Sequence, residues 1–143
     1  MPSKRTSVSH STPAQLGANS WGELRRRSSD IPWVLTGGFL GTLARYFLGF
    51  LGEPLWVLVA INSVGCLLLG MIFALRRSDR LTASGYALWG TGVMGSFTTF
   101  SGVMVLLVAP SAGVLTWLVV LTSIALGIAL AWLGQRLVGR GTS

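Results

Sequence analysis

Four long apolar segments occupy most of the 143-residue chain and limit what it can fold into. A helix needs about 20 apolar residues to cross the roughly 30 Å hydrocarbon core of a bilayer, since it rises about 1.5 Å per residue. The segments of this length span about 33–51, 54–75, 85–109 and 112–134. The links between them are short, so consecutive helices should be antiparallel neighbours. The sequence therefore predicts an all-α integral membrane protein with four transmembrane helices.

The composition of the chain supports lipid as its solvent. Charged residues make up 10% of the sequence, against about a quarter in a typical soluble domain. The formal net charge of +7 would favour a nucleic-acid partner in a soluble protein. Here the basic residues flank apolar segments, which is typical of a bilayer surface. We therefore expect the lipid bilayer as a partner and no nucleic acid.

Residues 1–30 differ in composition from the domain expected over 31–143. They are rich in Ser, Thr and Arg and lack a long apolar run, so we expect a basic, disordered tail. With four spans, this tail, the 76–84 link and the C-terminus lie on one side, and together they hold every Lys and Arg except Arg45. The positive-inside rule then predicts a multi-pass protein of the inner or plasma membrane with both termini cytoplasmic.

No carboxylate lies within a predicted span. The acidic residues, all in the tail or the links, are Glu23, Asp30, Glu53 and Asp79. Proton-coupled transporters rely on buried carboxylates or histidines, and the one histidine, His10, is in the tail. These positions argue against a small four-helix multidrug exporter, which would need a carboxylate in its first helix. They also argue against an enzyme that uses paired carboxylates.

The middle of the third span carries a polar cluster, GSFTTFSG, at residues 95–102. Gly and β-branched Thr are poor helix residues, so the sequence predicts an interrupted helix. Non-helical backbone at that depth is tolerated where it is buried in protein or lines a cavity. Carbonyls freed by the break would suit a small hard cation. The hydroxyls of Thr98, Thr99 and Ser101 could donate to an anion, and the ring edge of Phe100 carries partial positive charge.

Two further polar residues allow two interpretations each. Asn62, deep in the second span, either joins helices through its amide or donates a hydrogen bond into a pathway. Arg45, near the end of the first span, either extends to the interface or attracts anions at an entrance, which we favour.

The fourth span carries a stripe of small and hydroxyl residues. Thr116, Ser123 and Gly127 share one helical face, and Thr122 lies beside them. Hydroxyls in membrane helices often bond their own backbone, and the alternative is a track of donors. Together, these neutral donors suit a small anion that sheds its water.

Three segments resemble motifs of the CrcB/Fluc fluoride channels. They are GGFLGTLARY at 37–46, NSVGCLLLG at 62–70 and GSFTTFS at 95–101. The resemblance, over about residues 33–134, implies a fluoride-selective channel that exports fluoride passively and lowers its cytoplasmic concentration. It also implies an antiparallel dimer of CrcB-type subunits with two pores and a structural, non-transported sodium ion at the dimer centre.

The resemblance assigns roles to individual residues. Gly95 and Thr98 match the positions whose carbonyls bind the sodium ion. Asn62 and Phe100 match pore-lining residues, and Arg45 matches a basic residue near the pore vestibule. Thr99 and Ser101 fall in the matching polar stretch. The fourth-span residues Thr116, Thr122 and Ser123 have no clear counterpart.

One position departs from the pattern. The family often has a second Phe three residues after the first, and this chain has Val103 there. The residue between them, often Thr, is Gly102. The departure leaves homodimer and heterodimer open, and it keeps a non-conducting or partly conducting subunit of a heterodimeric channel as an alternative.

Overall fold

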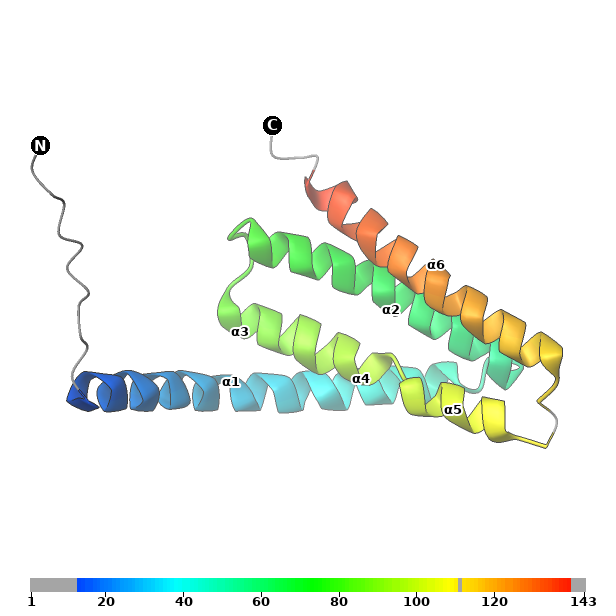
Figure 1. The fold of residues 1–143 in the computed structure, drawn as a ribbon, viewed down its shortest axis with the longest axis horizontal. Coiled ribbons are helices and arrows are strands. Elements are labelled where there is room, and N and C mark those ends of the chain that lie inside the picture. Colours follow the sequence, from blue (N-terminus) through cyan, green and yellow to red (C-terminus); the bar gives the residue numbers. More distant parts are fainter. Residues whose placement is uncertain (1–12, 111, 140–143) are drawn as a thin grey trace, which may run out of the picture.

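The computed structural model describes residues 13–110 and 112–139, with side chains from Ser28 onward. The described residues form helices and connecting turns, without a strand (Figure 1). The elements are α1 (Pro13–Leu48), α2 (Pro54–Arg77), α3 (Ala83–Tyr86), η1 (Ala87–Met94), α4 (Gly95–Phe97), α5 (Phe100–Val108) and α6 (Val114–Gly139). Elements α3, η1, α4 and α5 together form the expected third span, so the all-α, four-helix arrangement is confirmed.

Three helical stretches of the described chain are long and apolar enough to cross a membrane. They are Pro54–Arg77, Ala83–Val108 and Val114–Gly139. Helix α1, the expected first span, is not among them; its apolar residues are diluted by five glycines and by Arg45. It nevertheless packs along η1 and α4 in the bundle (Figure 1).

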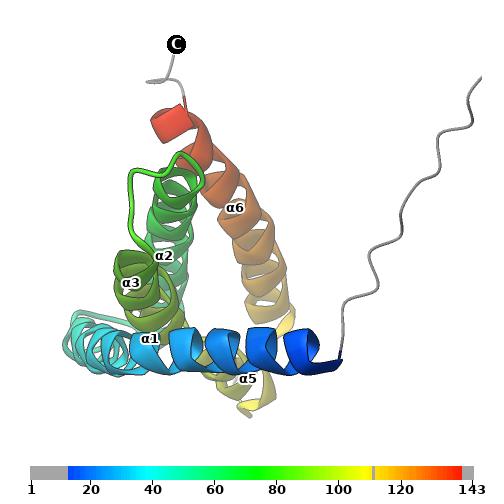
Figure 2. The same cartoon turned by 90° about the vertical axis from the view of Figure 1, so that its left-hand side faces the viewer.

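Helix α1 begins earlier than the sequence predicts. It starts at Pro13 and continues through Pro32, so residues 13–30 are helical where a disordered tail is expected. Residues 1–12 of that tail lie outside the described residues. Proline is well tolerated in the first turn of a helix, and the Glu, Leu and Arg residues that follow favour helix. The early part of α1 extends away from the other helices (Figure 2).

The helices pack through glycines at two close crossings. A Cβ added to Gly92 of η1 would lie 2.8 Å from the Cα of Gly37 in α1. A Cβ added to Gly134 of α6 would lie 3.3 Å from the carbonyl carbon of Gly70 in α2. Small residues allow such backbone approach, which associates helices in lipid. The bundle therefore consists of two tight pairs, α1 with η1 and α2 with α6.

The third span is interrupted, as the polar cluster predicts. Thr98 (ψ 153°) and Thr99 (φ −145°, ψ 123°) are extended, and α5 starts at Phe100. The break follows the short helix α4, which itself follows the π-helix η1. Side-chain hydroxyls satisfy nearby backbone groups: Thr98 Oγ1 donates to the Met94 carbonyl (2.9 Å), and Thr99 Oγ1 accepts from the Gly102 N–H (3.1 Å). Thr99 is thus the N-cap of α5.

Candidate functional site

The break in the third span is held by the side chain of Asn62 on α2. The Asn62 Nδ2 donates to the Thr99 carbonyl at 3.2 Å, and the Thr99 N–H donates to Asn62 Oδ1 at 2.9 Å. One amide therefore pairs both backbone groups of the residue at the centre of the break. A primary amide has two N–H donors, and this pairing uses one of them. Asn62 thus joins α2 to the third span, one of the two roles expected from the sequence. Its second N–H is not used in this pairing and could donate to an ion.

Two hydroxyls lie next to this pair. Thr99 Oγ1 and Ser101 Oγ are 3.1 Å apart and share a hydrogen bond. Ser101 is exposed and Thr99 is half-buried, so the hydroxyl pair extends from the break to the surface of the described chain. A hydroxyl can turn its hydrogen to suit an acceptor, and the pair can therefore donate to an anion.

An open cavity, called the central groove below, adjoins the break. Its volume is about 380 Å³. It is lined by α2, the break, α5 and α6, through Asn62, Cys66, Leu69, Thr98, Thr99, Phe100, Val103, Ser123, Ile124, Gly127, Ile128 and Ala131. The lining is mostly apolar, with a few polar groups, and none of these described residues carries a charged side chain. Such a surface suits a small solute held by neutral donors.

The groove brings together most of the candidate residues. Phe100 lines it while remaining 70% exposed, whereas Val103, one turn later, is buried. Ser123 of α6 also lines it, although its Oγ donates to the Val120 carbonyl at 2.7 Å. The exposed Phe100 leaves the groove open on one side.

Other candidates lie outside the groove. Gly95 is exposed, and a Cβ added there would meet no atom within 4 Å. Arg45 is half-buried near the end of α1. Thr122 Oγ1 donates to the Leu118 carbonyl at 2.8 Å, so its hydroxyl bonds its own helix. Thr116 lines a different cavity at the end of the bundle.

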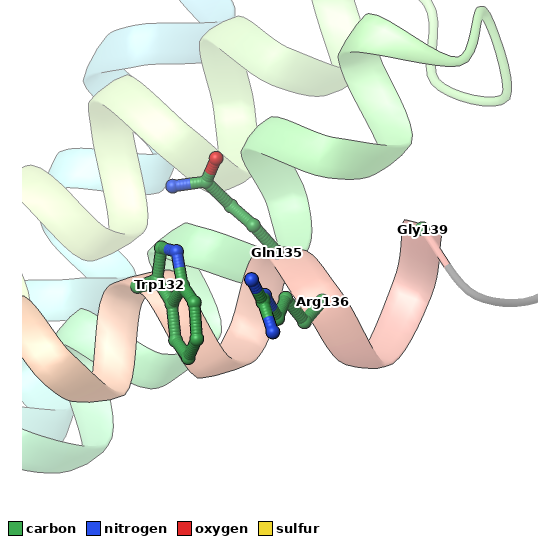
Figure 3. A pocket seen from close by; sticks show the side chains of 4 residues that line it. All are labelled: Trp132, Gln135, Arg136 and Gly139. Carbon is green, nitrogen blue, oxygen red and sulfur yellow. The ribbon is translucent and has the colours of Figure 1, made fainter.

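A further hollow, of about 310 Å³, lies at the end of α6 and contains none of the candidate residues (Figure 3). The Arg136 guanidinium stacks 3.6 Å over the Trp132 ring, while Gln135 extends away from the pair. A cation near a helix C-terminus is favoured by the helix dipole, and stacking on indole adds to this. The pair therefore stabilises the helix end.

The profile of the family described as CrcB-like protein, Camphor Resistance (CrcB), matches residues 32–135. The chain belongs to this CrcB-like family. A relative named fluoride-specific ion channel FluC, from Oceanobacillus iheyensis, is 42% identical over 113 residues, covering 73% of this chain and 87% of the relative.

Two more relatives carry the same name. The protein from Thermus thermophilus is 36% identical over 117 residues, covering 74% of this chain and 92% of the relative. The protein from Shewanella halifaxensis is 32% identical over 120 residues, covering 77% of this chain and 96% of the relative. No solved structure matched the chain. The part of α1 before Pro32 lies outside the matched CrcB-like residues.

Sequence reasoning missed several groove residues of this CrcB-like chain. Cys66 and Leu69 follow Asn62 on α2 by four and seven residues, a spacing that places them on the same helix face. On α6, Ile124, Ile128 and Ala131 flank the stripe of Ser123 and Gly127. Their helical spacing from Asn62 or Ser123 was the only sequence signal that they share a face with these polar residues. Apolar residues are common throughout a membrane helix, so this spacing alone does not distinguish groove residues from other apolar residues.

Proposed function

We propose that this chain is one subunit of a fluoride-selective channel that lets fluoride leave the cytoplasm passively. Its activity would lower the cytoplasmic fluoride concentration. The observation that carries the proposal is the convergence of Asn62, Thr99 and Phe100 on one uncharged groove, with the Ser101 hydroxyl bonded to that of Thr99. Membership of the CrcB-like family and relatives named fluoride-specific ion channels support it.

The lining of the groove explains how a small anion could be preferred. Fluoride must exchange its water for hydrogen-bond donors, and hydroxyl and amide groups supply them without a fixed charge. The edge of an aromatic ring carries partial positive charge, which Phe100 would present. A carboxylate would repel the ion, and the groove lining has none. The path requires no reaction, so the chain acts as a channel and not as an enzyme.

A second CrcB-type subunit of opposite orientation would close the pathway. The central groove is open and Phe100 is 70% exposed, so a lone subunit would leave the ion facing hydrocarbon. Charges and unpaired polar groups are costly there. We infer that the partner covers this side, with both termini of the present chain cytoplasmic. Arg45 then remains the candidate for a charge that attracts anions near an entrance.

A structural sodium ion is the proposed cofactor. The predicted ligands are the carbonyls of Gly95, the first residue of the short helix α4, and of Thr98, the residue that follows α4. The residues fit this role: Gly95 faces open space, and Thr98 leaves the helical conformation. Carbonyl oxygens suit a small hard cation, which would hold the break and, at a shared axis, two subunits. The described residues contain no cluster of His, Cys, Asp or Glu for another metal.

A second candidate function is a subunit that conducts only beside a different CrcB-type subunit. The buried Val103 favours it, because this chain supplies one aromatic ring where the family often has two. Co-expression with a closely related subunit separates the two candidates: fluoride release by the chain alone supports the first.

Growth of bacteria that lack fluoride export tests the proposed function. Cells expressing the chain should tolerate fluoride that stops the parent strain, because fluoride leaves down its gradient. Cells expressing Asn62→Ala at the same membrane level should not. If the wild-type chain reaches the membrane and gives no protection, alone or with a related subunit, the proposal is wrong.

A further inference from the structure

The polar lining of α2, α5 and α6 does not end with the central groove. A second cavity, called the end cavity below, has a volume of about 240 Å³. It lies where α2 and α6 begin and is lined by Glu53, Pro54, Leu55, Leu106, Ala112 and Thr116. Both cavities therefore involve the same three helices.

The register of these helices aligns the two cavities. Leu55 of the end cavity precedes Asn62 of the groove by seven residues on α2, and Thr116 precedes Ser123 by seven residues on α6. Residues seven apart share a face of a helix, and they are about 10 Å apart along its axis. On α5, Leu106 follows Val103 by three residues and also shares its face. The same faces of α2, α5 and α6 thus line both cavities.

The end cavity contains a carboxylate, unlike the central groove. Glu53 is exposed, directly precedes α2 and makes no side-chain capping hydrogen bond. Glu53 forms no ion pair with another described residue, whereas Asp79 is paired with Arg76, so no neighbour in the described structure neutralises the Glu53 charge. Arg45 is the only other ionisable charge expected on this side of the membrane, and it does not line the end cavity.

We propose that the end cavity is a mouth of the fluoride pathway and that the Glu53 carboxylate lowers the fluoride concentration there. The inference rests on the proposed function and adds a residue that sets the rate of the same pathway. A cleft lined by one sign of charge changes the local concentration of a diffusing ion. A lone carboxylate in an otherwise uncharged mouth repels fluoride, so Glu53 limits how often an ion reaches the groove.

Charge repulsion of this kind depends on ionic strength. The Debye length is about 30 Å at 0.01 M and about 3 Å at 1 M. Glu53 should therefore reduce the rate of fluoride passage at low ionic strength and have almost no influence at high ionic strength. If a Glu53 substitution instead altered the rate through the structure of the loop, the change in rate would be the same at low and at high ionic strength.

Fluoride efflux from liposomes containing Glu53→Gln tests the proposal, with an impermeant salt setting the ionic strength. At about 0.01 M, Glu53→Gln should release fluoride about two- to fivefold faster than wild type, and Glu53→Lys faster still, whereas at about 1 M the rates should converge. Total efflux is the readout, because a purified chain can enter a liposome in either direction, which places Glu53 at either membrane face. Because the Glu53 side chain is exposed and makes no capping hydrogen bond, Glu53→Gln should have little effect on folding.

Two control variants separate charge from structure. Glu53→Asp keeps the charge and should match wild type. Asp79→Asn removes a carboxylate from the 76–84 link, which lies on the opposite side of the membrane from Glu53, and it should not raise efflux. Asp79 has a φ of 54°, a conformation that Asn tolerates, so this change should not strain the backbone.

Equal rates for Glu53→Gln and wild type at low ionic strength would overturn the inference, and so would an increase of the same size at both ionic strengths. A wild-type chain that releases no fluoride, alone or with a related subunit, would instead contradict the proposed function, so the two failures are distinguishable.

Discussion

Asn62 holds Thr99 by two hydrogen bonds that link residues 37 positions apart in the sequence. The amide replaces the helical partners that the Thr99 N–H and carbonyl lose when the third span breaks. Backbone groups at this depth need a partner within the protein, since lipid offers none. The polar break is therefore anchored to α2, and the position of its hydroxyls depends on this one side chain.

Replacing Asn62 should abolish fluoride passage. Asn62→Ala removes a donor from the groove and leaves two backbone groups of Thr99 without their partner, which costs about 1–3 kcal/mol for each buried group. Fluoride efflux from liposomes should fall to the level of protein-free liposomes, with lower thermal stability in detergent. The matched control is Ser63→Ala on the same helix, because the buried Ser63 Oγ has no hydrogen-bond partner within the described structure. Normal flux through a folded Asn62→Ala protein would defeat the assignment.

Two neighbouring glycines of α1 should respond differently to the same change. A Cβ added to Gly37 would meet the Leu88 carbonyl oxygen and lie 2.9 Å from the Gly92 Cα, whereas one added to Gly38 would meet nothing within 4 Å. Overpacking a close contact typically costs about 1–3 kcal/mol. Gly37→Ala should therefore lower the melting temperature in detergent, and Gly38→Ala should leave it unchanged. Equal melting temperatures would show that α1 and η1 do not cross here.

Much of the fold follows from the sequence, because apolar length and short links define membrane helices. The interruption near Thr98 and Thr99 was also predictable, since Gly and Thr cluster where a helix should continue. The helical residues 13–30 were not, because their polar composition resembles that of a disordered tail, whereas their local helix preference is carried by a few Leu, Glu and Arg residues. The pairing of Asn62 with Thr99 also required the structure, since it depends on how α2 packs against the break.

Sodium should be required for full activity if the carbonyls of Gly95 and Thr98 hold the proposed ion. Extended dialysis against a large organic cation should reduce fluoride efflux, and returning sodium should restore it. Thr98→Ala retains the carbonyl and should keep the sodium dependence, provided that the protein folds. Efflux that is the same with and without sodium would argue against the ion.

The orientation of the chain should be fixed by its charges. Apart from Arg45, the Lys and Arg residues lie in the tail, the 76–84 link and the C-terminal region, which share one side when four helices cross the membrane. Reporters fused to the C-terminus should therefore indicate a cytoplasmic location. An antiparallel dimer then requires a partner with the opposite bias. Equal cytoplasmic and external populations would instead identify a dual-topology homodimer.

The most direct test of the central claim compares two anions in one preparation. Liposomes loaded with fluoride and chloride, and containing the purified chain alone or with a closely related subunit, are given a potassium ionophore so that charge does not limit efflux. Selective electrodes then follow both ions. The uncharged donors of the central groove predict that fluoride leaves rapidly while chloride is retained. Chloride release at the same rate, or no release of fluoride in either preparation, would contradict a fluoride channel.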